Sequence, residues 1–437
     1  MLVPYWCFAA SLLEVQPMRF AVVLHGLLLA GVAAAVQAAD WPSFRGRDGN
    51  GIADGQQVPV HWNRQRNVKW SARLPRPGNG SPIVSAGRVF ITSAEDTEGR
   101  QRSLYCFDRR QGVQNWVRTV KIGTTLPTHQ TNPYAGSTPV SDGQRVVAWH
   151  ASAGLHCYDI TGKPLWSRDL GEFRHMWGYG TSPIIYRDRV ILFSGPGKRI
   201  FTGAYRLADG TTLWETDELQ EGDGEHNTAG NYMGSWSTPV IAQVDSKSCV
   251  VVMLPTRVGA FSPDTGELIW TCDGLRHERG DLAYSSPVIA GDLCFVTGGF
   301  RGPAMAIRLG GTGNVTQHRR LWRTEKNPQS IGSGVYVSGV VYRPNADQRM
   351  SLQCIEIMTG KIRWSVPGKG HWGSVVMAGG LLYATDQQGR TVVFKPNPDK
   401  YEEVAVNPLE EPSNSTPAVS DGDLFIRTAG HIFCIGN

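Results

Sequence analysis

Residues 262–270 read SPDTGELIW, a tight turn followed by a strand that ends in a tryptophan. Gly266 supplies the positive φ that such a hairpin needs, and the Asp and Thr before it are residues that bond their own backbone in turns. A turn glycine followed four residues later by tryptophan recurs at Gly112 and Trp116, Gly162 and Trp166, Gly210 and Trp214, and Gly360 and Trp364. A further copy, GGTGNVTQHRRLW (310–322), carries an insertion in its turn. This repetition indicates a fold built many times from one small unit.

A second signature recurs out of phase with the first. It places Ser or Thr before Pro and a short β-branched run, at SPIV (81), TPVS (138), SPII (182), TPVI (238), SPVI (286) and TPAV (416), with SGVYV (333) and GSVVM (373) as degenerate forms. Proline fits the first residue of a strand, where no ladder N–H is required. The starts are spaced by roughly 40 to 57 residues, which is the period of propeller blades. We therefore predict an all-β fold, an eight-bladed β-propeller of four-stranded antiparallel blades.

The two ends of the chain complement each other. Trp70 in NVKW stands alone before the first full repeat, and the last repeat (415–437) stops after three strands. We expect the N-terminal strand around Trp70 to complete the last blade, which removes exposed sheet edges. The propeller is thus predicted over residues 67–437. Residues 39–66 are predicted to form an extended N-terminal strap, with Trp41 and Phe44 of WPSFRGRDGNG buried against the ring near the closing blade.

The repeat tryptophans are predicted to pack between adjacent blades, where each would bury about 200 Å². This set comprises Trp70, Trp116, Trp166, Trp214, Trp270, Trp322 and Trp364.

The N-terminal region has the pattern of a secretory signal peptide. If Met18 is the working start, residues 18–40 contain a basic residue, an apolar run and small residues, with Val36 and Ala38 before the expected cleavage site. We therefore predict that residues 1–38 are upstream sequence and a signal peptide, and that the mature protein is periplasmic or secreted. The run is too short for a membrane span, so no transmembrane segment is predicted.

Charge and cysteine usage exclude several classes of function. The net charge is +5 over 437 residues, and basic and acidic residues alternate, so a nucleic-acid partner is not expected. Of the eight cysteines, Cys7 precedes the expected cleavage site, and no CxxC or CC pair occurs. This argues against a zinc knuckle and a haem attachment site. Four cysteines hold equivalent repeat positions, in LYCFD, LHCYD, LQCIE and IFCIG, where we expect them to behave as buried small apolar side chains. The seven cysteines after the cleavage site cannot all pair with one another, and the sequence leaves their pairing open.

The repeat units also carry a family resemblance. GSTPVSDGQRVVAWHASAGLHCYDITGKPLW (136–166) and SPDTGELIW resemble the repeats of PQQ-binding-like β-propellers, a superfamily that holds quinoprotein alcohol dehydrogenases and the assembly factor BamB. The likeness extends over nearly all of the mature chain. It implies the propeller fold, but the same blades serve enzymes and scaffolds alike.

The dehydrogenase alternative requires features that the sequence does not show. Such an enzyme needs PQQ held over the axis, a cation such as Ca²⁺ bound by carboxylate and amide oxygens, and an Asp base. The vicinal disulfide that often covers the cofactor in the family has no counterpart, and no residue can be carried over as ligand or base. We predict no catalytic residue and no metal site, and we interpret GDGEHN (222–227) as a solvated loop.

The loops that lead into the inner strands are rich in aromatic residues and histidines. By repeat phase they project from one face of the ring, around the channel mouth, where they can stack a flat ligand, a sugar or a peptide. The alternative is that they pack against neighbouring loops to fill the ring. The candidate residues are His129, Tyr134, Trp177, Tyr179, Tyr232, Trp236, Tyr284, His371 and Trp372, with His175 and His226 in the same loops.

These observations favour a non-catalytic binding or assembly scaffold in the cell envelope, similar to BamB-like proteins. The expected partner is an envelope protein or an extracellular polymer, and we expect a monomer. A PQQ-dependent oxidoreductase of alcohols or aldose sugars and a carbohydrate-binding propeller are the alternatives. BamB proteins are typically lipoproteins, whereas no cysteine follows the small-residue motif here, so lipid anchoring is not predicted.

Overall fold

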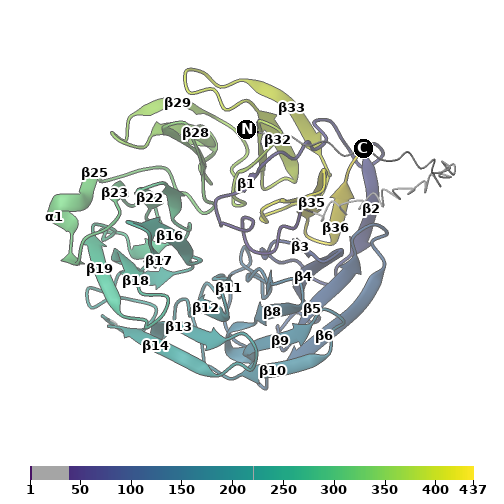
Figure 1. Cartoon of the computed structure of the whole chain (residues 1–437), viewed down its shortest axis with the longest axis horizontal. Coiled ribbons are helices and arrows are strands. Elements are labelled where there is room, and N and C mark those ends of the chain that lie inside the picture. The colour runs from purple at the N-terminus through teal and green to yellow at the C-terminus, as the bar shows by residue number, and fades with distance from the viewer. Residues whose placement is uncertain (2–38, 220) are drawn as a thin grey trace. The chain divides into compact units, whose positions relative to one another are not determined.

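The computed structural model describes Met1, residues 39–219 and residues 221–437. The predicted signal peptide, which begins at Met18, lies outside the described residues. Contacts divide the chain into two units, Met1–Gln37 and Ala38–Asn437. Within the second unit, eight antiparallel sheets of four successive strands stand around a ring (Figure 1). The predicted eight-bladed propeller is confirmed.

The strands of blades 1 to 7 run in chain order from the inner to the outer edge, and blade 8 takes its outer strand from the N-terminal segment. Blades 1 to 4 are β3 (Ile83–Ser85), β4 (Arg88–Ala94), β5 (Gln101–Asp108) and β6 (Gln114–Lys121); β7 (Val140–Ser141), β8 (Arg145–Trp149), β9 (Leu155–Asp159) and β10 (Pro164–Arg168); β11 (Ile184–Tyr186), β12 (Arg189–Phe193), β13 (Ile200–Arg206) and β14 (Thr212–Glu218); β16 (Val240–Val244), β17 (Lys247–Met253), β18 (Arg257–Phe261) and β19 (Leu268–Asp273).

Blades 5 to 8 follow in the same order. They are β21 (Val288–Ala290), β22 (Leu293–Thr297), β23 (Ala304–Arg308) and β25 (Arg320–Arg323); β26 (Val335–Val337), β27 (Val340–Pro344), β28 (Leu352–Glu356) and β29 (Ile362–Val366); β30 (Val376–Ala378), β31 (Leu381–Thr385), β32 (Arg390–Phe394) and β33 (Glu403–Pro408); β34 (Ala418–Ser420), β35 (Asp423–Arg427), β36 (His431–Ile435) and β2 (Val68–Arg73).

Short elements extend this pattern. β24 (Gly313–Asn314) adds a parallel fifth strand outside blade 4, and β1 (Ile52–Ala53) adds one inside blade 7. β15 (Met233–Ser235) and β20 (Asp281–Ala283) form a separate parallel pair. The helical turns are α1 (Thr316–Arg319), η1 (Ala151–Ala153) and η2 (Gln348–Met350).

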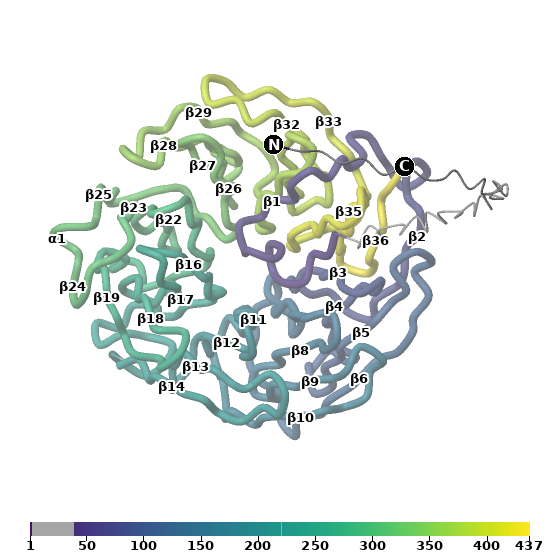
Figure 2. The backbone as a smooth tube through the Cα atoms, in the orientation of Figure 1, coloured from purple at the N-terminus to yellow at the C-terminus, as the bar shows by residue number. Residues whose placement is uncertain are grey.

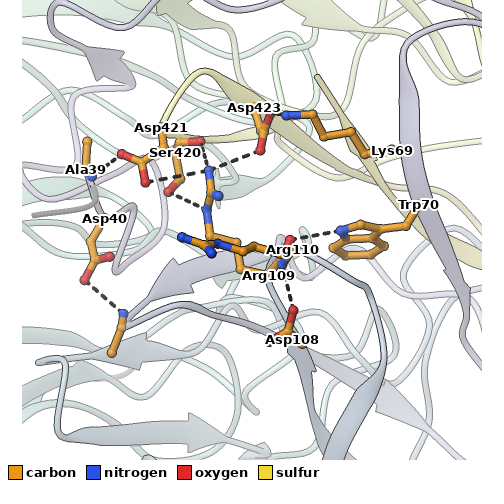
Figure 3. Close-up of polar contacts among 11 residues, drawn as sticks. Ala39, Asp40, Lys69, Trp70, Asp108, Arg109, Arg110, Ser420, Asp421 and Asp423 are labelled. Carbon is orange, nitrogen blue, oxygen red and sulfur yellow. Dashed lines mark hydrogen bonds and ion pairs between the residues drawn. The ribbon is translucent and has the colours of Figure 1, made fainter. Parts of the chain in front are cut away.

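The last blade is closed by the N-terminal strand, as the sequence predicts. β2 pairs antiparallel with β36, and Trp70 lies opposite Cys434. Arg109 ties this blade to blade 1, since its Nη2 donates to Ser420 O over 2.6 Å and to Asp423 Oδ2 over 3.2 Å (Figure 3). Within blade 8, Lys69 Nζ of β2 lies 2.7 Å from Asp423 Oδ1 of β35. The ring therefore has no open edge between its first and last blades.

The repeat tryptophans reach across the blade boundaries. Trp116 Nε1 donates to Ile160 O of blade 2 over 3.3 Å, and its indole lies against Gly162 of the same turn. Trp70, Trp166, Trp214 and Trp322 repeat both contacts with the next blade, and Trp364 bonds Asn397 O and packs on Phe394 and Tyr401. Trp270 differs because the insertion after β23 covers it, with Trp270 opposite Gly313. Each turn glycine of the repeat thus receives a tryptophan from the preceding blade.

The strap crosses the ring instead of staying near the closing blade. Trp41 is buried and bridges Val84 of blade 1, as expected, but Arg45 bonds Gly334 O of blade 6, and β1 joins β30 of blade 7. Figure 2 shows this segment, in purple, over the middle of the ring between the labels β1 and β3. Phe44 is half-buried and lines an axial cavity, which differs from the prediction because the strap spans the channel.

All seven cysteines of the described residues are buried and unpaired. The burial of the four at equivalent repeat positions is as expected. Burial raises the pKa of Cys106, Cys157, Cys354 and Cys434 to about 12. They pack as small apolar side chains inside the blades.

Candidate functional site

A cavity with a volume of about 370 Å³ lies on the axis of the ring. We call it the cup. The loops before the inner strands line its mouth, the first residues of the inner-strand segments line its middle, and Phe44 of the strap lines it as well. The strap pairs with the inner strands beyond their first residues, as at Val84 and Met377. Along the axis, the cup is therefore lined first by the mouth loops, then by the first residues of the inner strands, and last by the strap.

An aromatic wall occupies one side of the cup, on the loops of blades 3 to 5. Its members lining the cup are Trp177, Trp236, Tyr284 and Phe300. Trp177 lies 5.1 Å from Phe300 and 5.9 Å from Trp236, and Trp236 lies 5.4 Å from Tyr284, as ring centroids. Such tilted and edge-on contacts fix the rings in place and leave a continuous apolar surface toward the cup.

The parallel pair β15 and β20 positions part of this wall. Ser235 lies opposite Ala283, and Trp236 N donates to Ala283 O over 2.8 Å, so the next residues, Trp236 and Tyr284, stand side by side. Trp236 Nε1 donates to Gly178 O over 2.9 Å, which joins the loop of Trp177 to the same framework. The wall is therefore held by backbone pairing between consecutive loops.

Amide side chains occupy the opposite side of the cup, from the loops of blades 8, 1 and 2. Asn79 and Asn414 both donate through Nδ2 to Thr131 O, over 2.9 and 3.3 Å, and Asn132 Nδ2 donates to Trp177 O and Tyr179 O. Their N–H groups brace the loops. The carbonyl oxygens of Asn79 and Asn414, and the amide of Gln329, have no hydrogen-bonding partner among the residues that the structure describes, so they are available to a ligand.

A closed belt of eight hydroxyl residues surrounds the middle of the cup. In each blade the backbone N–H of one member donates to the hydroxyl oxygen of the next member, over 2.9 to 3.1 Å, and the last member returns to the first. The belt runs Ser81, Thr138, Ser182, Thr238, Ser286, Ser333, Ser374 and Thr416, and all of them except Ser81 line the cup.

The belt explains the second sequence signature better than its proline does. Ser333 and Ser374 belong to the degenerate copies, which lack the proline but keep the hydroxyl. The hydroxyl is retained because it accepts a hydrogen bond from a buried N–H of the preceding blade, which would otherwise lose its partner. The belt is thus a second device, beside the tryptophans, that joins the blades.

The structure places some of the predicted site residues in the cup and others behind it. His129, Trp177, Trp236, Tyr284 and Trp372 line the cup. Tyr232 packs behind Trp177, with their ring centroids 4.7 Å apart, and the ring of His226 lies 5.2 Å from that of Tyr232.

Tyr134, Tyr179, His175 and His371 lie within the loops, away from the cup. Tyr179 donates to Tyr134 O over 2.7 Å, Tyr134 donates to Leu126 O over 2.6 Å, and Arg102 lies against both rings. His175 bonds Met233 O, and His371 is buried, so burial lowers the pKa of both imidazoles. The two tyrosine hydroxyls and the imidazole of His175 bond neighbouring loop segments, which is the packing alternative that the sequence left open.

Phe300 was missed by the sequence analysis. It lies on the hairpin between β22 and β23, whereas the sequence predicts candidates only in the loops before inner strands. Because the strands of a blade are antiparallel, the hairpin between the second and third strands lies at the same face of the ring as the loop before the first strand. The signal in the sequence was an apolar residue inside the glycine-rich GGFRG (298–302).

The residues of the cup do not match a calcium-bound PQQ. The cation and the catalytic base of a PQQ site call for nearby carboxylates. No Asp, Glu, Lys or Arg lines the cup in the described part of the chain. Across residues 39–219 and 221–437, no three His, Cys, Asp or Glu side chains gather into a metal-binding group.

Comparisons agree with this architecture. A quinohemoprotein alcohol dehydrogenase from Comamonas testosteroni has a TM-score of 0.65 at 12% identity, covering 91% of this chain and 80% of that one. BamB from Moraxella catarrhalis has a TM-score of 0.57 at 15% identity, covering 85% and 99%. A europium-containing methanol dehydrogenase has a TM-score of 0.52 at 11% identity, covering 91% and 98%. No curated protein sequence matches the chain significantly.

The fold and the repeats define a PQQ-like β-propeller. The family model described as outer membrane protein assembly factor BamB matches residues 100–366, more than half of the 437 residues, so the chain belongs to this family. None of the helices in the described residues is long and apolar enough to cross a membrane.

Proposed function

We propose that this protein is a non-catalytic binding or assembly scaffold of the cell envelope, and that the cup holds its ligand or a segment of its partner. The observation that carries this proposal is the lining of the cup, where an aromatic wall faces amides across a belt of hydroxyls. Such a lining binds by stacking and hydrogen bonding. Among the described residues that line the cup, none is a carboxylate that could bind a cation or abstract a proton. The histidine of the lining, His129, is exposed at the rim of the cup.

Family membership supports the role and the location. The matching family is described as an outer membrane protein assembly factor, and the signal-peptide pattern of residues 18–40 fits export to the periplasm or beyond. We infer a monomer that holds an envelope protein or an extracellular polymer. Stacking side chains on loops of a rigid ring suit this task, because the ring fixes the loops before the partner arrives.

Site-specific cross-linking in living cells tests this function. A photoreactive residue in place of Trp372, at the cup, is expected to capture a defined envelope partner or polymer. The matched control replaces Ile362, which is exposed on the outer strand β29. Capture from position 362 with none from position 372 would contradict a binding role for the cup.

A carbohydrate-binding propeller is a second candidate, favoured by the aromatic wall beside free amide oxygens, since sugar rings stack on aromatic faces while their hydroxyls bond amides. A PQQ-dependent oxidoreductase is favoured by two of the structural neighbours, which are dehydrogenases. Their sequence identities to this chain are 12% and 11%, so the likeness supports a shared fold and not a shared activity. The amides of the cup could serve a calcium ion, yet the carboxylates that PQQ chemistry requires are absent from the described lining.

A further inference from the structure

The belt hydroxyls have an unused hydrogen-bonding capacity that faces the cup. Each hydroxyl oxygen accepts from the next N–H around the ring, which fixes one lone pair. None of the eight O–H groups has an acceptor within residues 39–219 and 221–437. A circle of buried O–H donors around an axial cavity matches a group that is rich in acceptors and poor in donors.

Three buried arginines adjoin the belt. Arg427 Nη1 donates to Gly80 O over 3.0 Å, Arg45 Nη2 donates to Gly334 O, and Arg343 lines a small gap together with Ser286 and Ser333. Gly80 and Gly334 are the chain neighbours of belt residues Ser81 and Ser333. The three guanidinium groups therefore lie close to the belt, on the strap and in blades 6 and 8.

These arginines carry charge that the surrounding protein does not balance. No ion pair to Arg45, Arg343 or Arg427 occurs in the part of the chain that the structure describes, and carbonyl or amide oxygens are their acceptors. Burial lowers the pKa of each to about 9, so each stays protonated at neutral pH.

The buried acids are engaged elsewhere. Asp281 pairs with Arg276, Asp386 with Arg390, and Asp423 with Lys69 and Arg109. Buried charges in proteins are ordinarily paired, because an isolated ion in a low-dielectric interior is costly. The interior around the belt thus has an excess of positive charge, and a low-dielectric cavity strengthens its field.

We propose that the belt and these arginines form an oxyanion-binding site on the axis of the ring, which takes a carboxylate, sulfate or phosphate group of the ligand. The inference rests on the proposed binding function and adds the charge of the ligand to it. The belt supplies direct O–H donors, and the buried guanidinium groups supply the field. The aromatic wall then covers whatever carries the oxyanion, a sugar acid or the acidic end of a peptide.

Calorimetric titration of the purified full chain with inorganic phosphate, at constant ionic strength against chloride, tests this site. We expect saturable binding. The double variant Ser286→Ala and Ser333→Ala is expected to weaken it by about tenfold or more, because hydrogen bonds to charged groups are the stronger ones. The control is Ser285→Ala, whose hydroxyl bonds Thr297 Oγ1 over 2.9 Å and does not line the cup. If the double variant folds poorly, Ser374→Ala alone provides the same comparison.

Competition identifies the source of the oxyanion. Glucuronate is compared with glucose, and a peptide with a free C-terminal carboxylate is compared with its amidated form, each against bound phosphate. We expect the acid member of a pair to displace phosphate and the neutral member to fail. Absence of saturable phosphate binding, or equal binding by neutral and acid members, would overturn the oxyanion site. Capture of a partner from position 372 would still support the binding function in that case. The two experiments therefore distinguish a failure of the oxyanion site from a failure of the proposed function.

Discussion

Trp214 of blade 3 lies so close to Gly266 of blade 4 that a Cβ at residue 266 would fall 2.5 Å from its Cε3 atom. Trp214 Nε1 also donates to Pro263 O over 3.1 Å in the same turn. The turn of SPDTGELIW therefore requires glycine for two reasons. Gly266 adopts a φ of 74°, and it leaves room for the tryptophan of the preceding blade.

The first prediction separates the effect of the positive φ from that of the contact with Trp214. Gly266→Ala should lower the free energy of unfolding by about 3 kcal/mol, since it adds a clash to the cost of a positive φ. Gly291→Ala is the control, because Gly291 has a φ of 61° with open space around its Cβ position, and it should cost about 1 kcal/mol. Urea titration of both variants measures the difference. Equal losses would show that the contact with Trp214 contributes nothing.

Ring closure gives a second prediction. Trp70→Ala should destabilise the protein by about 3–5 kcal/mol, because Trp70 is buried in the closing strand and joins blade 8 to Arg109 of blade 1. Limited proteolysis should then cut the variant within residues 39–73 sooner than the native protein. Unchanged stability and cleavage would contradict a closing role for β2.

The cysteines give a third prediction. In the native protein, the seven cysteines of residues 39–437 should show no reaction with a thiol reagent at pH 8, since burial raises the pKa of thiols such as Cys249 and Cys272 to about 11 and shields them. In strong denaturant every thiol should react. Rapid labelling of the native protein would show that the blades open locally.

Stability should fall with acid, and His150 is a named contributor. It is fully buried near His156 and Arg102, and burial is the largest cause that holds its pKa well below the usual value. The unfolded chain protonates this residue near pH 6.5 and the folded protein does not, so its contribution is complete above pH 6.5 and is lost as the pH falls.

His150→Gln should therefore reduce the decline of the melting temperature between pH 7 and pH 5, without abolishing it, because burial lowers the pKa of His156, His175 and His371 too. The control is His318→Gln, on the exposed turn α1. An identical pH profile for native protein and His150→Gln would refute the assignment.

The aromatic wall gives a prediction for binding. Phe300→Ala should weaken capture or ligand affinity by about tenfold, as expected for loss of an aromatic contact in a buried site, with little change in stability because Phe300 is only half-buried. Ile362→Ala on the outer strand should leave binding unchanged. Equal effects of both substitutions would place the binding surface outside the cup.

The sequence was sufficient for the ring and its closure, because the spacing of Gly266 and Trp270 repeats locally and Trp70 lacks strands of its own. It was sufficient for part of the cup, since Trp177, Trp236, Tyr284 and Trp372 follow the repeat phase. It could not reveal the belt, because Ser81 and Thr416 meet only after the ring closes. Nor could it place Phe44, whose position depends on the path of the strap across the channel.

The central claim is that the cup binds without catalysing. The most direct measurement is dye-linked oxidation of alcohols and aldoses by the purified protein after incubation with PQQ and Ca²⁺. The proposed function predicts no turnover above that of a Trp177→Ala variant treated in the same way. Substrate-dependent turnover in the native protein that Trp177→Ala abolishes would contradict the account and make the cup an active site.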